Sequence, residues 1–426
     1  MTDVVNAFDG TEPPAAQGEF HPIDSRDAGS PDAKLAELRR SCPVSRASRD
    51  GFPAVTVVAK YDDVAAVFRN WRTFGNIGSD PDPSVHDRTP LNRQNIIELD
   101  PPAHSWARRL DNLAMAPGAV EAALDYVSDI AGSLVDAFVD RSEADLVAEW
   151  AEPLPSLAIA RVLGLPPEDA PIIHGWVASQ HSESAVKAAG RAYGVIPVLG
   201  GAFEEYLHGQ IAKRRESDAP DDALARMVQF QRDDGSYFSD DEISIHVRTL
   251  LNAGNETTTS LMSNLVYRLL GQPGLYERVA NDRSLVAMAI EESLRLDAPL
   301  QVIIRRATRD AQIGGCAVSA GEVLALSTLS ANRDEDVWGE SAERFDIDRF
   351  APGVETAAHM GFGLGIHHCV GAYLARQTTT RGIDALLDRI PTMRLADGFE
   401  YENVFRHVFH RPRRLPVVFP AGRSAG

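Results

Sequence analysis

One stretch of the sequence constrains this chain more than any other. It reads GFGLGIHHCVGAYLAR, from Gly361 to Arg376, and it contains Cys369, one of three cysteines. Gly363 and Gly365 favour a loop with positive φ angles or a close backbone approach to another group. A cysteine at the end of such a loop could be a small buried apolar residue, a zinc ligand, a nucleophile or a ligand of a larger prosthetic group.

These alternatives make different demands on the sequence. Zinc is conceivable because His359, His367, His368 and Cys369 could all be ligands, but no second Cys/His pair stands at the fixed short spacing that structural zinc sites usually have. A nucleophile is conceivable because a helix beginning at Val370 would lower the pKa of the thiol. The same helix start would also stabilise a thiolate as the axial ligand of haem iron.

Composition narrows the class of protein. The chain has 426 residues, of which 44% are hydrophobic and 24% charged, so it can bury a sizeable core. Its net charge of −19 argues against general binding to nucleic acid or to an anionic membrane. The sequence shows neither a signal peptide nor an apolar run that could cross a bilayer, and its few cysteines suit a reducing compartment, so a cytoplasmic location is expected.

Helical patterns dominate the middle of the chain, and short strands follow Pro299. Residues 240–270 form one long helical pattern, which the segment AGNETTT is expected to interrupt. A loop rich in helix breakers, residues 75–93, is expected to act as a lid or binding loop. Residues 1–30 are expected to form a loose arm and residues 31–426 a single domain. The predicted fold class is mainly α with a small β-rich part.

The cysteine loop resembles the haem-binding loop of the cytochrome P450 family, which reads Phe-Gly-x-Gly-x-His-x-Cys-x-Gly. Every fixed position of that motif is filled, by Phe362, Gly363, Gly365, His367, Cys369 and Gly371. The resemblance implies that Cys369 is the thiolate ligand of the iron of haem b, and that a long central helix crosses the haem. In this interpretation Phe362 shields the sulfur and Gly371 lets the next helix lie close to the macrocycle.

Two further groups of residues match the family in order along the chain. Glu292 and Arg295 share a helix face and, together with Arg349, resemble the family's buried Glu-Arg-Arg network. Its implied role is structural, because a charged cluster taken out of water must be fully paired.

The second group implies anchoring of the haem. His104 and Arg108 share a helix face and resemble the family's propionate-binding pair. With Arg305 and His367 they would supply cations for two carboxylates.

The segment LLNAGNETTTS resembles the part of the central helix that passes over the haem. The resemblance places Ala253 and Gly254 beside the haem and makes Glu256 and Thr257 the acid–alcohol pair that delivers protons for the activation of dioxygen. Thr257 could also donate a hydrogen bond to a carbonyl one turn back. The family more often has Asp at the position of Glu256, so the acid here is one methylene longer.

By family position, the substrate pocket should draw on the 75–93 loop and on Leu250, Asn252, Val302, Ile303, Ile304, Arg406 and His407. This largely apolar set suits a hydrophobic or aromatic small molecule. The implied reaction is hydroxylation or oxidative coupling, in natural-product biosynthesis or catabolism.

No flavin or iron–sulfur module is evident, so the electrons are expected to come from a ferredoxin and a ferredoxin reductase, with Arg109 and Arg376 steering an acidic ferredoxin. Two other functions compete with this hypothesis. The first is a haem-based sensor or carrier, which would not need the proton relay of Glu256 and Thr257. The second is a zinc-stabilised helical interaction protein built on His359, His367, His368 and Cys369.

Overall fold

A computed structural model describes residues 22, 32–49, 52–76, 95–180, 201–216, 218, 220–404 and 408–421. Almost all of the expected N-terminal arm lies outside these residues, as do residues 77–93 of the expected lid and the pocket candidates Arg406 and His407. The arm and the single domain therefore stay predictions.

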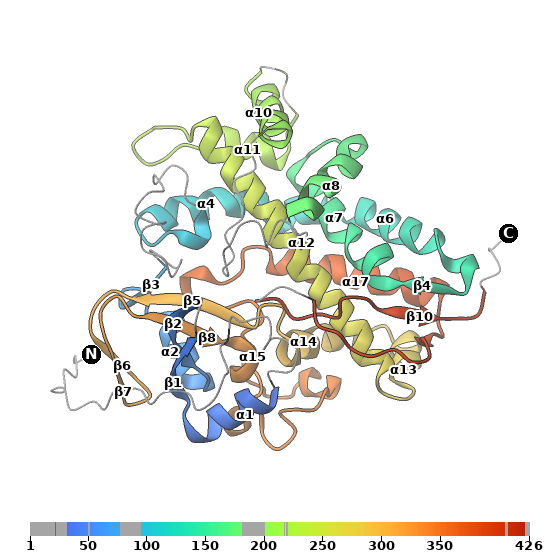
Figure 1. The fold of residues 1–426 in the computed structure, drawn as a ribbon. Coiled ribbons are helices and arrows are strands. Elements are labelled where there is room, and N and C mark those ends of the chain that lie inside the picture. Colours follow the sequence, from blue (N-terminus) through green and yellow to red (C-terminus); the bar gives the residue numbers. More distant parts are fainter. Residues whose placement is uncertain are drawn as a thin grey trace.

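Helices make up most of the described chain (Figure 1). The α-helices are α1 Asp32–Ser41, α2 Tyr61–Arg69, α4 Ala103–Ala114, α5 Pro117–Glu121, α6 Leu124–Asp136, α7 Pro153–Leu163, α8 Ala170–Gln180, α10 Ala202–Arg214, α11 Ala223–Val228, α12 Asp240–Leu270, α13 Leu275–Asn281, α14 Leu285–Leu296, α15 Thr328–Ala331, α16 Glu335–Trp338 and α17 Ala372–Arg389. Short 3-10 turns are η2 Ile96–Glu98, η3 Val139–Arg141, η5 Pro167–Asp169, η6 Ile347–Phe350 and η7 Gly365–His367, and η4 Val147–Ala151 is a π-helical turn.

The β part is small. Its strands are β1 Val44–Arg49, β2 Phe52–Val58, β3 Phe74–Gly75, β4 Glu143–Asp145, β5 Val302–Ala307, β6 Ala311–Ile313, β7 Cys316–Val318, β8 Val323–Ser327, β9 Arg394–Leu395 and β10 Pro416–Val418. The main sheet has the order β1-β2-β8-β5-β3, in which only β2 and β8 run parallel. A three-stranded sheet, β4-β10-β9, and the β6-β7 pair lie apart from it. The predicted fold class, mainly α with a small β part, is confirmed.

Helix α12 is the axis of the fold and crosses the molecule diagonally in Figure 1. It begins with a capping box in which Ser239 and Glu242 satisfy each other's backbone N–H groups. The expected interruption at AGNETTT does not occur, because α12 continues unbroken to Leu270. Neighbouring helices α7, α10, α14 and α17 pack along it, and burial overrides the weak local helix propensity of this segment.

Apolar side chains form a core on each side of α12 and on both faces of the main sheet. The largest cluster joins α6, α7, α12, α14 and α17, and a second joins α4, α10, α11 and α12. The sheet packs one face against α1 and the other against α2. In the described part of the chain, no helix is long and apolar enough to span a lipid bilayer.

Candidate haem site

The Cys369 loop contains the 3-10 turn η7 and leads directly into α17. Gly363 and Gly365 have φ angles of +65° and +73°, which glycine adopts without strain. The N–H of Cys369 donates to the carbonyl of Phe362 at 2.9 Å and closes the loop. The cysteine is thereby presented two residues before Gly371, the N-cap residue of α17.

The surroundings of the Cys369 thiol act on its pKa in opposite directions. The residue has an exposed side, yet burial among protein atoms raises the pKa of the thiol above its usual value. The N–H of Gly371 and the nearby cations Arg108 and Arg376 act in the opposite direction. The helix start thus acts on the pKa in the direction that the sequence predicted, although desolvation is the larger effect. A bound metal cation would favour the thiolate.

Cationic side chains gather on one side of the cysteine loop. His104 on α4 is buried, and its ring centroid lies 4.3 Å from that of His367. Burial, followed by the positive neighbours His367 and Arg108, lowers the pKa of His104 to about 4. Arg305 on β5 is 5% exposed, and burial lowers its pKa to about 10. Arg108 reaches the loop and donates to the carbonyl of His368 at 2.6 Å.

This cluster fits the two carboxylates of a haem. The buried Nε2 atom of His104 has no hydrogen-bond partner among the described residues. The Nε2 atom of His367 lies 3.7 Å from Oδ1 of Asp100, beyond hydrogen-bond length. Burial lowers the pKa values of all four basic groups, and carboxylates placed beside them would favour their charged forms. The four residues that the sequence suggested for this role therefore have the chemistry that the group requires.

The central helix presents a small open face. Ala253 is exposed, although Leu251 and Asn252 beside it are buried. Thr257 lies one turn further along, and its hydroxyl donates to the carbonyl of Ala253 at 2.7 Å. Gly254 has a different neighbour, because a Cβ there would lie 2.8 Å from Ile159 Cδ1 on α7. Its lack of a side chain thus permits the packing of α7 against α12.

Glu256 lies in a buried ion pair that the sequence did not indicate. Its Oε1 accepts a hydrogen bond from Arg411 Nε at 2.8 Å, and Arg411 Nη2 also donates to Glu152 Oε1 at 2.9 Å. Side-chain exposure is 3% for Glu256, 2% for Arg411 and 39% for Glu152. The acid of the expected acid–alcohol pair is therefore held by a residue from the C-terminal part of the chain.

The Glu292–Arg295 pair is completely buried and bidentate, with both N···O distances at 2.7 Å. Arg349 joins it, with its Nε 3.4 Å from Glu292 Oε2. Arg295 also donates to the carbonyl of Asn332, whose side-chain oxygen accepts from the N–H of Met360, just before the cysteine loop. The three residues named from the sequence come together and connect α14 to that loop.

The expected pocket residues divide into separate surroundings. Val302 and Ile304 pack in the core cluster that contains Leu35 and Leu38 of α1, on the face of β5 opposite Ile303. Val302 and Ile304 therefore face α1 and Ile303 faces the α2 side, and the pocket roles of all three stay predictions.

The two pocket candidates on α12 are buried. Leu250 belongs to the cluster with α4 and α10. Asn252 donates to the carbonyl of Arg248, and its buried Oδ1 has no partner among the described residues.

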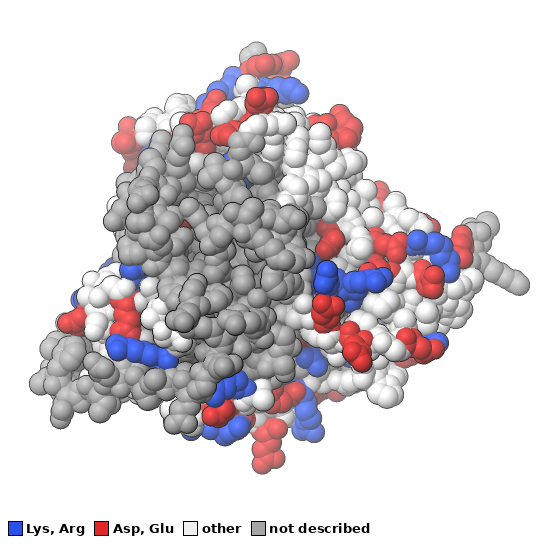
Figure 2. Space-filling view, in the orientation of Figure 1, with Lys and Arg blue, Asp and Glu red and all other residues white. Residues whose placement is uncertain are grey.

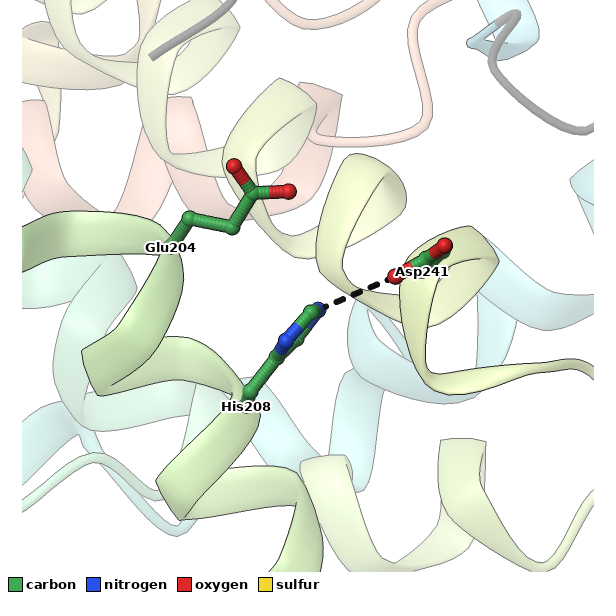
Figure 3. Close-up of side chains that lie close together, drawn as sticks. All are labelled: Glu204, His208 and Asp241. Atoms are coloured by element: carbon green, nitrogen blue, oxygen red, sulfur yellow. Dashed lines mark ion pairs between the residues drawn. The ribbon is translucent and has the colours of Figure 1, made fainter. Parts of the chain in front are cut away.

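The residues considered as zinc ligands are not gathered. His359 Nε2 lies 2.9 Å from Glu291 Oε2, and His367 faces Asp100. Within the described ranges, three metal-ligating side chains converge at one place, Glu204 and His208 on α10 with Asp241 at the start of α12 (Figure 3). That group is partly exposed, and an ion pair of 3.3 Å between His208 and Asp241 accounts for its geometry.

The two arginines expected to steer a ferredoxin are both in ion pairs. Arg109 lies 3.3 Å from Asp233, and both side chains are largely exposed. Arg376 makes a bidentate pair with Glu291 and lies over the ring of Phe362. On the face shown in Figure 2, acidic and basic side chains are interspersed among the described residues.

A mainly helical fold, a long helix with an open face, a cysteine at a helix start and buried cations suited to two carboxylates define a haem-thiolate oxidoreductase. Comparison with known proteins agrees. The family model described as Cytochrome P450 matches residues 201–389. Mycinamicin IV hydroxylase/epoxidase of Micromonospora griseorubida is 32% identical over 372 residues, covering 85% of this chain and 88% of that protein. The chain belongs to the cytochrome P450 family and is a haem-dependent monooxygenase.

Two further relatives span nearly the whole chain. Vitamin D(3) 25-hydroxylase of Pseudonocardia autotrophica is 31% identical over 401 residues, which cover 91% of this chain and 94% of that protein. The crystal structure of CYP109E1 from Bacillus megaterium in complex with testosterone is similar with a TM-score of 0.78 and 30% identity, covering 91% of this chain and 99% of the other. The sequence-based identification of the family and of its cofactor is confirmed.

Proposed function

We propose that this monooxygenase hydroxylates or oxidatively couples a hydrophobic or aromatic small molecule in natural-product biosynthesis or catabolism. The named relatives act on mycinamicin IV and vitamin D(3), and CYP109E1 was crystallised with testosterone. The apolar character of Leu250 and Ile303 supports a substrate of the same general kind.

The observation that carries the proposal is the presentation of Cys369 by the glycine loop, with the N–H of Gly371 favouring the anionic sulfur. Cys369 would hold the iron, and Phe362, which stacks with Arg376, would shield that side of the site. His104, Arg108, Arg305 and His367 would bind the two carboxylates. When bound, the haem supplies the oxidising chemistry.

The chain itself would manage the protons. Thr257 carries a hydroxyl on the open face of α12, and Glu256 is the adjacent carboxylate on the same helix. A hydroxyl with a titratable group behind it can pass protons inward from the protein. A sensor or carrier needs no such pair, so these two residues favour catalysis.

Electrons would come from a ferredoxin and its reductase in the cytoplasm. Arg109 is the better of the two expected steering residues, because an exposed ion pair contributes little and Asp233 can be exchanged for a carboxylate of the partner. Arg376 is already held by both oxygens of Glu291. Charge reversal in Arg109→Glu should slow the first electron transfer, with a steeper loss at low salt. An unchanged rate at low ionic strength would remove Arg109 from the interface.

The difference spectrum of the reduced protein with and without carbon monoxide tests the proposed axial ligand. Wild-type protein should show a strongly red-shifted Soret band, and Cys369→Ala should lose it. A band typical of histidine ligation in the wild type would refute the role of Cys369. With the thiolate band established, a spin-state shift on adding candidate molecules would identify the substrate class.

A further inference from the structure

We propose that Arg411 is a positioning residue for Glu256, and that Glu152 controls how firmly Arg411 holds the Glu256 carboxylate. The proposal rests on the proposed role of Glu256 in proton delivery. It assigns functions to two residues that lie outside the acid–alcohol pair itself.

The contact geometry makes Arg411 a bridge between two carboxylates. Its Nε donates to Glu256 Oε1 at 2.8 Å, its Nη2 to Glu152 Oε1 at 2.9 Å, and its Nη1 to the carbonyl of Pro412 at 3.1 Å. All three nitrogens of the guanidinium are therefore engaged, and the planar fork fixes the direction from which Glu256 is held.

Arg411 is itself firmly placed by its backbone. Its N–H donates to Asn403 Oδ1 at 3.0 Å, and its carbonyl accepts from Val404 at 2.9 Å. The preceding residue, His410, accepts a hydrogen bond at its carbonyl from Asn264 on α12. The segment that carries Arg411 is thus hydrogen-bonded to α12 at Asn264, two turns beyond Glu256 on the same helix.

Burial strengthens the effect of Arg411 on the ionisation of Glu256. The side chains of Arg411 and Glu256 are 2% and 3% exposed, so neither has water as an alternative partner of comparable strength. A buried carboxylate without a cation favours its protonated form, and one with a cation beside it favours the anion. Arg411 therefore keeps Glu256 oriented and ionised between proton transfers.

Glu152 modulates the interaction between Arg411 and Glu256. It is 39% exposed, and it competes with Glu256 for one guanidinium. Neutralising Glu152 leaves the positive charge of Arg411 to Glu256 alone, whereas neutralising Arg411 removes that charge. The two changes must shift the protonation of Glu256 in opposite directions. In each transfer Glu256 takes up one proton from solvent, releases one proton toward the open face of α12 that carries the Thr257 hydroxyl, and so returns to the anion paired with Arg411.

The experiment compares Arg411→Gln, Arg411→Lys and Glu152→Gln in the haem-loaded protein, with Glu256→Gln as the reference. Infrared difference spectra across a pH series report the protonation of Glu256, identified as the carboxyl band absent from Glu256→Gln. The fraction of electrons recovered in product, against hydrogen peroxide, reports proton delivery.

In Arg411→Gln the midpoint for protonation of Glu256 should move to higher pH. Product per electron should fall about three- to tenfold, less than the roughly 10²–10⁴-fold contribution of a whole general acid–base group, because Glu256 itself remains. In Glu152→Gln the midpoint should move to lower pH. Arg411→Lys should largely restore the pH midpoint of Glu256 and partly restore the fraction of electrons recovered in product. Lysine keeps the positive charge but lacks the planar guanidinium.

Arg214→Gln is the matched control. Arg214 is 4% exposed and makes a buried pair with Asp222 at 2.7 Å, remote in sequence from Arg411 and Glu256. Its loss should lower stability without altering coupling or the Glu256 band. If Arg411→Gln behaves as this control does, Arg411 is merely structural and the inference is overturned. Midpoints that move together in Arg411→Gln and Glu152→Gln would also overturn it.

The proposed role of Glu256 can fail separately. Full coupling in Glu256→Gln would refute that role and, with it, this inference. Uncoupling in Glu256→Gln with an unchanged band and unchanged coupling in Arg411→Gln would refute the inference alone.

Discussion

Gly365 packs directly on the carbonyl oxygen of Phe68, because a Cβ built at Gly365 would lie 2.5 Å from that atom. Phe68 is on α2, and its ring lies beneath the guanidinium of Arg305 at 5.3 Å. The contact therefore joins the cysteine loop to the sheet side of the haem site. It also explains why the loop needs glycine at this position beyond its φ of +73°.

Gly365→Ala should destabilise the protein by more than the strain of a positive φ. Strain alone is about 1–2 kcal/mol, and overpacking against backbone adds roughly 1–3 kcal/mol. Gly398→Ala is the matched control, since Gly398 has a φ of +76° and nothing within 4 Å of a built Cβ. Urea unfolding of both variants measures the difference. Equal losses would show that the loop moves away from Phe68 at no cost.

Glu292→Gln should reduce the free energy of unfolding by about 3–5 kcal/mol, because it leaves Arg295 and Arg349 buried without their carboxylate. The haem content of the purified protein should fall with it, since Arg295 connects through Asn332 to the cysteine loop. The control is Asp348→Asn, whose exposed pair with Arg278 should contribute no more than about 1 kcal/mol. A loss of stability with full haem content would show that the Glu292–Arg295–Arg349 network stabilises the fold but does not hold the cysteine loop.

Thr257→Val should leave stability almost unchanged and divert electrons to hydrogen peroxide. Valine keeps the shape of threonine but lacks the hydroxyl that the proposed proton path requires. Thr249→Val removes an equivalent hydroxyl on α12, one that donates to the Ile245 carbonyl at 2.8 Å. Peroxide formed per electron should rise several-fold in Thr257→Val only. A rise of the same size in both variants would point to a general effect on the helix.

The haem-free protein should lose stability as the pH falls from about 6.5 to about 4. The pKa of His104 is about 4 in the folded chain, below the usual value near 6.5, so in this window the unfolded chain binds more protons. One such group changes the free energy of unfolding by up to about 1.4 kcal/mol per pH unit. Urea unfolding at successive pH values, with His104→Gln as reference, isolates this group.

Loading haem should flatten the same pH profile, because carboxylates beside His104 and His367 favour their protonated forms. If the contribution of His104 to the profile is the same with and without haem, His104 is not a carboxylate ligand.

Local patterns predicted much of this molecule. The cysteine loop is a contiguous motif, and the bounds of α12 match the helical pattern of residues 240–270. The spacing of Glu292 and Arg295 predicted that they share a helix face, and the family resemblance implied their burial with Arg349.

Two features could not be predicted, for different physical reasons. Arg411 and Glu256 are 155 residues apart, and nothing local distinguishes Arg411 from other arginines of the C-terminal part. Strand β5 is covered on both faces, so its side chains do not alternate between apolar and polar. The sequence therefore did not separate Val302 and Ile304, which face α1, from Ile303 on the opposite face.

The position of Arg411 in the chain has a consequence for synthesis. At roughly 5–20 residues per second, a ribosome adds the 155 residues between Glu256 and Arg411 in about 8–30 seconds. Throughout that interval two carboxylates of the nascent chain, Glu152 and Glu256, exist without the cation that they later share. These buried charges around α12 can be paired only after Arg411 has been made, so the final packing there must follow the synthesis of helices α1 to α17.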